Sequence, residues 1–158
     1  RQFAIGQADL TSTPLQVARL MAMVASGGRD VMPRLRMATQ SNSPEIQLAA
    51  ASSAMYRLSS QTVAAVQQGL VSSVSDPEGN AHAAEIPGLL IAGKSGTADV
   101  GDRKPSHAWF AGYVPADNPR YSVVIYLEHG GSGELVAAPL ARQLILSMIE
   151  ANLLRIEN

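Results

Sequence analysis

The sequence has no cysteine, few aromatic residues and only two lysines among its 158 residues. Without cysteine, the chain can form neither disulfide bonds nor thiolate metal sites. Its three histidines, His82, His107 and His129, show none of the spacings typical of metal ligands. The sequence therefore predicts a protein without disulfides and with no metal site.

Strong charge and long apolar runs are absent as well. The net charge is −1 and the basic residues are scattered, which gives no support for a nucleic-acid partner. No apolar run approaches the roughly 20 residues of a membrane-spanning helix, and no signal-peptide pattern is present. With 46% hydrophobic and 16% charged residues, the composition is typical of one globular domain with an apolar core.

The most informative segment present is Lys94, Ser95, Gly96 and Thr97, which follows a short apolar run. The lysine supplies positive charge, and the two hydroxyls can donate hydrogen bonds to anionic oxygens. The glycine has no side chain, so a ligand can approach the backbone closely. On a strand, these four residues would bind a carboxylate and a peptide backbone. The alternative is an ordinary surface lysine whose aliphatic stem covers apolar neighbours.

The helices can be predicted from their start signals. Thr13 is typical of a helix N-cap, because Pro14 follows at the first helical position and Gln16 completes a capping box. Residues 15–25 are apolar on nearly every face, which predicts a buried helix that ends at the glycines 27–28.

Two further helices follow the same logic. Ser59 or Ser60 is expected to cap a helix in which apolar residues recur at helical spacing between positions 63 and 74. Residues 76–80 form a turn cluster. Pro139 is expected to open a last helix, whose apolar stripe consists of Leu140, Leu144, Ile145, Met148 and Ile149.

Three strands are predicted near residues 89–97, 107–114 and 121–128, and the last two are joined by a connection of hairpin length. A further short strand is predicted over residues 31–37. Within residues 121–127, apolar residues occur at both odd-numbered and even-numbered positions, so both faces of this strand carry apolar side chains. This pattern indicates a sheet covered on both faces. The predicted fold class is therefore α/β of the α+β type, with an antiparallel sheet and helices packed on both faces.

Three stretches of the sequence carry a family resemblance. Residues 5–18 read IGQADLTSTPLQVA, residues 91–98 read IAGKSGTA, and residues 107–115 read HAWFAGYVP. Their order and spacing resemble the C-terminal half of the transpeptidase domain of class B penicillin-binding proteins, where the lysine element is the K-[T/S]-G motif. Two mild departures are Ala8, where the family usually has glycine, and Ser95, where threonine is commoner.

The resemblance implies a fold, an activity and roles for named residues. The fold is the β-lactamase/transpeptidase-like one, and the activity is peptidoglycan cross-linking by a D,D-transpeptidase through an acyl-serine intermediate. Stem peptides and β-lactams are the implied ligands, and no cofactor is implied. Lys94 and Thr97 would be catalytic, with the Thr97 N–H in the oxyanion hole, and residues 94–97 would bind the substrate.

The family's nucleophile motifs are missing from this chain. Neither Lys94 nor Lys104 has a serine three residues before it, so S-x-x-K is absent, and no serine forms S-x-N. Residues 1–158 are therefore expected to be the C-terminal part of a transpeptidase domain, and the N-terminal part of the same domain is the expected partner. The resemblance also implies the extracytoplasmic face of the bacterial cytoplasmic membrane, with an N-terminal transmembrane anchor in the parent protein.

Three alternatives remain open from the sequence. One is a β-lactamase or a β-lactam sensor, which fast turnover of a β-lactam would reveal. Another is a non-catalytic module that binds cell-wall peptide or a division partner, which an upstream S-x-x-K would disfavour. The third is an inactive fragment, a cleavage product or one chain of a two-chain protein.

Overall fold

A three-stranded antiparallel sheet lies at the centre of the protein. The computed structural model describes residues 11–33, 59–101 and 103–156. The strands are β1 (Ala92–Ala98), β2 (His107–Val114) and β3 (Tyr121–Leu127), and they follow one another in the order β1-β2-β3. The predicted antiparallel strands are confirmed, and β1 lies at one edge of the sheet.

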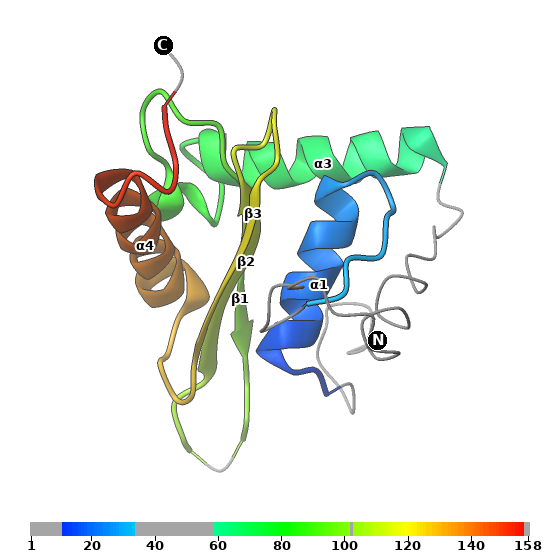
Figure 1. The fold of residues 1–158 in the computed structure, drawn as a ribbon. Helices are drawn as coiled ribbons and strands as arrows, with labels where there is room; N and C mark the ends of the chain where they lie inside the picture. The colour runs from blue at the N-terminus through cyan, green and yellow to red at the C-terminus, as the bar shows by residue number, and fades with distance from the viewer. Residues whose placement is uncertain (1–10, 34–58, 102, 157–158) are drawn as a thin grey trace, which may run out of the picture.

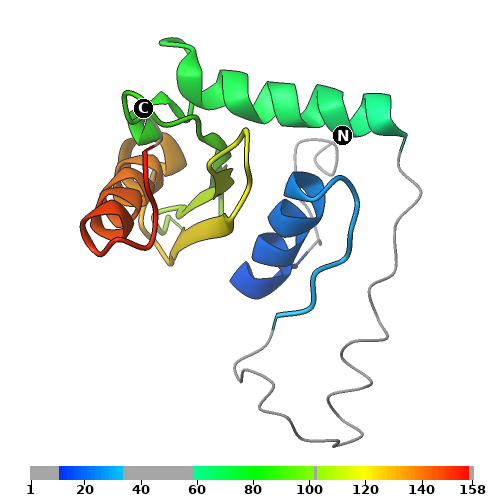
Figure 2. The same cartoon turned by 45° about the horizontal axis from the view of Figure 1, so that its top comes forward.

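Helices lie on both faces of this sheet, as predicted. Figures 1 and 2 show α1 (Pro14–Ala25) on one face and α4 (Ala138–Glu150) on the other. The third helix, α3 (Ser60–Ser75), runs across one end of the sheet and on past α1. The two faces of the sheet are therefore enclosed by elements that lie far apart in the sequence.

The core lies between the sheet and α4. Phe110 and Val114 of β2 have no exposed surface, and Ile145 of α4 is 1% exposed. Alternate residues of β3 point into this core, as the sequence pattern predicts: Val123 is buried, and its neighbours on the same face pack around it. Because Phe110 lies under α4, the residue paired with it on β1 also points toward that side.

The start of α1 is as predicted, but its burial is not. The Thr13 hydroxyl and the Gln16 side chain form the complete capping box. However, no residue of α1 is buried, and Leu15 and Leu20 remain 61% and 48% exposed. The prediction of a buried helix is wrong for the described residues, because the sheet covers only one side of α1.

The start of α3 is also confirmed, with Ser59 as its N-cap. Only Val63 and Val74 of its apolar residues are buried, and Val66 is 45% exposed. Only the ends of this stripe are therefore buried by the rest of the described chain.

Some boundaries differ from the predicted ones. The strand β1 begins at Ala92 rather than near residue 89, because Ile86 and Leu89 pair in a tight bridge just before it. A short helix η2 (His82–Ala84) follows the turn after α3, and a π-helix η3 (Gly133–Ala137) leads directly into α4. The strand predicted over 31–37 is absent at residues 31–33, and residues 34–37 lie outside the described residues.

Candidate functional site

The four residues of the lysine element all lie on the edge strand β1. Side chains alternate along a strand, so Lys94 and Gly96 share one face, and Ser95 and Thr97 share the other. The register places Ser95 opposite Phe110, whose side chain is part of the core under α4. The Lys94 side chain therefore leaves β1 on the face covered by α1, and the side chains of Ser95 and Thr97 leave it on the opposite face.

The Lys94 ammonium is held by two neutral oxygens. Its Nζ donates to the side-chain oxygen of Asn80 at 2.9 Å and to the Ser95 carbonyl at 2.8 Å. Partial burial lowers the pKa of Lys94 below its usual value, and the negative charge of Glu134 counteracts this shift. Among the described residues the ion pairs join Arg19 to Asp30 and His82 to Glu85, so no carboxylate pairs directly with Lys94.

The Ser95 hydroxyl is buried and already engaged. Ser95 is 7% exposed, and its Oγ donates to the backbone carbonyl of Asn80 at 2.6 Å. A hydroxyl has one proton to donate, so this bond ties β1 to the loop that follows α3. The role predicted for Ser95, donation to a substrate carboxylate, requires this hydroxyl to exchange its partner.

The Thr97 side chain anchors a different segment. Its Oγ1 accepts a hydrogen bond from the backbone N–H of Gly133 at 3.0 Å. Gly133 is buried against β1 so closely that an added Cβ would overlap the Gly96 carbonyl and lie 2.7 Å from the Gly96 nitrogen. Thr97 therefore positions the start of η3 against the back of the lysine element.

A cavity of about 630 Å³ lies in front of the element, between the start of α1 and the sheet. Trp109 and Tyr126 form an aromatic wall, with ring centroids 4.4 Å apart, and His107 meets Tyr126 edge to face. Lys94 supplies positive charge from the same face of the sheet, because Gly96, two residues after it on β1, pairs with Trp109. The full lining is Thr11, Ser12, Thr13, Pro14, Val17, Met21, Lys94, Ser95, Gly96, Thr97, Ala98, His107, Trp109, Ala111 and Tyr126. Such a cavity suits a ligand with an anionic group and an apolar or planar body.

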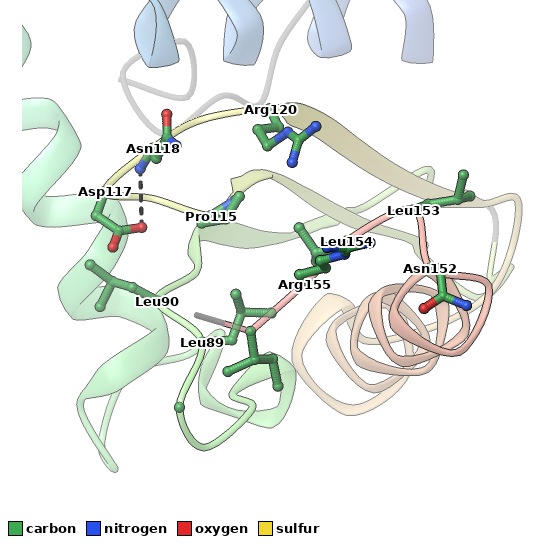
Figure 3. Close-up of a pocket in the computed structure, with 12 residues that line it drawn as sticks. Leu89, Leu90, Pro115, Asp117, Asn118, Arg120, Asn152, Leu153, Leu154 and Arg155 are labelled. Atoms are coloured by element: carbon green, nitrogen blue, oxygen red, sulfur yellow. Dashed lines mark hydrogen bonds between the residues drawn. The ribbon is translucent and has the colours of Figure 1, made fainter. Parts of the chain in front are cut away.

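A second cavity of about 630 Å³ lies at the opposite end of the sheet. Its walls come from the connection between β2 and β3, the approach to β1 and the C-terminal segment (Figure 3). None of residues 94–97 lines it. The lysine element is therefore associated with the cavity beside α1 and not with this one.

Two residues of this site were not singled out by the sequence. Asn80 lies in a segment that reads only as a turn, yet it contacts both Lys94 and Ser95. Gly133 follows two glycines after β3, which reads as an ordinary loop. The signal for Gly133 was the glycine-rich run itself, since buried glycines often mark a close backbone approach. No signal within the sequence pointed to Asn80.

The described residues provide neither a cluster of metal ligands nor a membrane-spanning helix. They contain no cluster of three or more histidine, cysteine, aspartate or glutamate side chains suited to hold a metal ion. None of the helices in these ranges combines the length and the apolar character needed to cross a membrane.

Known proteins resemble this chain along most of its length. Residues 1–146 match the transpeptidase family described as penicillin binding protein transpeptidase domain. Peptidoglycan D,D-transpeptidase MrdA of Haemophilus influenzae is 28% identical over 97% of this chain and 26% of its own length. Peptidoglycan D,D-transpeptidase PbpA of Mycolicibacterium smegmatis is 32% identical over 92% of this chain and 31% of its own length.

Solved structures agree with this assignment. The ceftriaxone acyl-enzyme complex of penicillin-binding protein A from Mycobacterium tuberculosis matches with a TM-score of 0.72 and 30% identity. The match covers 92% of this chain and 34% of that one. This chain thus spans about a quarter to a third of the length of these relatives. Because the family match covers 146 of its 158 residues, the chain belongs to the penicillin-binding protein transpeptidase domain family.

Proposed function

We propose that this chain is the C-terminal part of the transpeptidase domain of a peptidoglycan D,D-transpeptidase that also binds β-lactams. The observation that carries the proposal is the Lys94 ammonium, which lies on an edge strand beside an aromatic-walled cavity and, among the described residues, donates to two neutral oxygens. The D,D-transpeptidases among its relatives support the reaction class. The acyl-enzyme structure of a relative supports acylation by β-lactams.

The proposed reaction has two acyl-transfer steps. A serine in the N-terminal part of the domain attacks the carbonyl carbon between two D-alanines of a stem peptide. A new ester bond forms, the peptide C–N bond breaks, and the terminal D-alanine leaves with a proton on its nitrogen. The amine of a second stem peptide then attacks the ester carbonyl carbon, a new amide bond cross-links the peptides, and the ester C–O bond breaks. The serine oxygen regains a proton, which comes from the attacking amine.

This chain would contribute charge and hydrogen-bond donors to those steps. Lys94 would attract and orient the terminal carboxylate of the stem peptide or the anionic group of a β-lactam. The N–H of Thr97 would donate to the oxyanion that develops on the attacked carbonyl. Ser95 and Thr97 hydroxyls would turn from Asn80 and Gly133 toward the carboxylate when the ligand binds, and Gly96 would let the ligand backbone approach β1.

The N-terminal part of the same domain is the proposed partner of this chain. The exposed side chains of Leu15 and Leu20 on α1 offer it apolar surface to cover. The proposed location is the extracytoplasmic face of the bacterial cytoplasmic membrane, where the peptidoglycan substrate is found, with the parent protein anchored by an N-terminal transmembrane helix.

Labelling with fluorescent penicillin tests this proposal. The full-length protein that contains this chain should carry S-x-x-K and S-x-N before Arg1 and should acquire one covalent label per molecule. The isolated chain should stay unlabelled, because neither of its lysines follows a serine at the activating spacing and an unactivated hydroxyl is a weak nucleophile. Stoichiometric labelling of the isolated chain, or none of the full-length protein, would contradict the proposal. Rapid hydrolysis of the penicillin would indicate a β-lactamase instead.

Thr97→Val separates the threonine hydroxyl from the backbone N–H. Valine keeps the shape of the side chain and the backbone N–H. It can neither donate a hydrogen bond to the substrate carboxylate nor accept the hydrogen bond from the Gly133 N–H. Charge-assisted hydrogen bonds contribute about 1.5–3 kcal/mol, so acylation of the full-length protein should slow by about ten- to a hundred-fold. The matched control is Thr97→Ser, which keeps the hydroxyl and should stay close to wild type. Equal acylation rates for valine and threonine would show that the hydroxyl has no role.

A further inference from the structure

Asn80 contacts the lysine element at two consecutive residues. Its side-chain oxygen accepts from Lys94 Nζ at 2.9 Å and from Ser73 Oγ at 3.1 Å, while its backbone carbonyl accepts from Ser95 Oγ at 2.6 Å. Asn80 belongs to the loop after α3, fourteen residues before Lys94. The loop is therefore hydrogen-bonded to β1 through Asn80, whose side-chain oxygen accepts from the Lys94 ammonium.

The backbone around Asn80 is firmly held in place. Gly79 packs so closely on α3 that an added Cβ would lie 2.8 Å from the carbonyl carbon of Ser73. On the other side, Ala81 is completely buried, and its N–H donates to the Ser73 carbonyl at 3.1 Å. Because both neighbours are held against the end of α3, the backbone position from which the Asn80 side chain extends is fixed.

The chemistry of asparagine suits a lysine that must keep its charge available. An amide oxygen accepts a hydrogen bond from the ammonium without adding a negative charge, whereas a carboxylate would pair with it and cancel much of its field. Among the described residues, one acidic group influences Lys94, namely Glu134 of η3. It acts through its charge and forms no hydrogen bond with the ammonium. A free lysine side chain loses much rotamer entropy when it is fixed, and a contact made before binding reduces that cost.

We propose that Asn80 is a positioning residue that holds the Lys94 ammonium, which has no directly paired carboxylate among the described residues, at the place where the anionic group of the substrate or β-lactam arrives. This inference rests on the proposed function. Asn80 acts through Lys94 and does not itself contact the ligand. Its backbone carbonyl accepts from Ser95 whatever the side chain, so Asn80→Ala removes the side-chain hydrogen bonds to Lys94 and Ser73 and leaves the bond to Ser95.

A double-mutant cycle in the full-length protein tests the proposal. Asn80→Ala should slow acylation by fluorescent penicillin by about tenfold, the loss expected for a hydrogen bond to a charged group. In a Lys94→Ala background the same substitution should have almost no further effect, because its consequence passes through the lysine. Asn118→Ala, on the exposed connection between β2 and β3, is the matched control and should leave the rate unchanged.

Asn80→Asp keeps the shape and an acceptor oxygen, so it covers the case in which the alanine variant does not fold. It should also slow acylation, because the carboxylate pairs with the ammonium, and Lys94→Ala should suppress that loss. A second readout, independent of activity, is the Lys94 pKa, measured by NMR on labelled lysine and identified through the signal lost in Lys94→Ala. It should fall in Asn80→Ala and rise in Asn80→Asp.

The outcomes separate this inference from the proposed function. An unlabelled wild-type protein overturns the proposed function, and with it any role of Asn80 in acylation. A labelled wild type with an unaffected Asn80→Ala variant overturns only the inference. Additive losses for Asn80→Ala and Lys94→Ala, with no change in the Lys94 pKa, would show that Asn80 serves folding alone.

Discussion

Gly133→Ala is expected to slow penicillin acylation of the full-length protein by about a hundredfold and to lower its thermal stability. The new methyl group would overlap the Gly96 carbonyl, which is backbone and cannot move without displacing β1. Overpacking of this kind costs about 1–3 kcal/mol, which corresponds to a fall of several degrees in the unfolding midpoint. A shift of β1 by about 1 Å also misplaces the substrate-binding groups, and such a shift can cost a hundredfold in rate.

Gly69→Ala is the matched control for this prediction. Gly69 lies within α3, and an added Cβ would meet no atom within 4 Å apart from the backbone of its own helix. Alanine is favoured over glycine in a helix by about 0.5–1 kcal/mol, so this variant should be as active as wild type and slightly more stable. If Gly133→Ala matched Gly69→Ala in acylation rate and thermal stability, the close contact between η3 and β1 would not be needed for acylation.

Lys94→Ala is expected to slow acylation by about a hundred- to a thousandfold, with little loss of stability. Truncating one partner of a hydrogen-bonded charge pair typically costs about 2–5 kcal/mol, and the anionic group of the ligand would lose its ammonium partner here. The lysine is exposed, and its hydrogen bonds go to neutral oxygens, so its loss leaves no buried charge without a partner. Acylation rates across a range of penicillin concentrations would measure the effect, with thermal unfolding as the check on folding.

The second lysine of the chain provides the control. Lys104 is exposed in the loop between β1 and β2, and Lys104→Ala removes the same charge without touching the cavity beside α1. It should acylate at the wild-type rate. Lys94→Arg would test geometry, because it retains the charge on a planar fork that cannot reproduce the ammonium contacts. Full acylation of Lys94→Ala would make Lys94 an ordinary surface lysine.

The sequence by itself determined the elements whose signals are local. Thr13 caps α1 because its partner Gln16 is three residues away, and β2 and β3 follow from alternation within a few residues. The same is true of the element at residues 94–97, whose residue types and position on a strand can be read without any other part of the chain. The family resemblance rested on three such local stretches in the right order, and residues 5–10 of the first lie outside the described residues.

Only the tertiary structure decided which groups those residues meet. Ser95 and Thr97 read as ligand-binding hydroxyls, yet one bonds to Asn80, fifteen residues earlier, and the other to Gly133, thirty-six residues later. The exposure of α1 likewise depends on what covers it and not on its own composition. Hydrogen bonds and burial between distant segments arise from packing, which has no periodic signature along the chain. The sequence therefore predicts residues 94–97 as a candidate site, and the fold determines that Asn80 and Gly133 hold them.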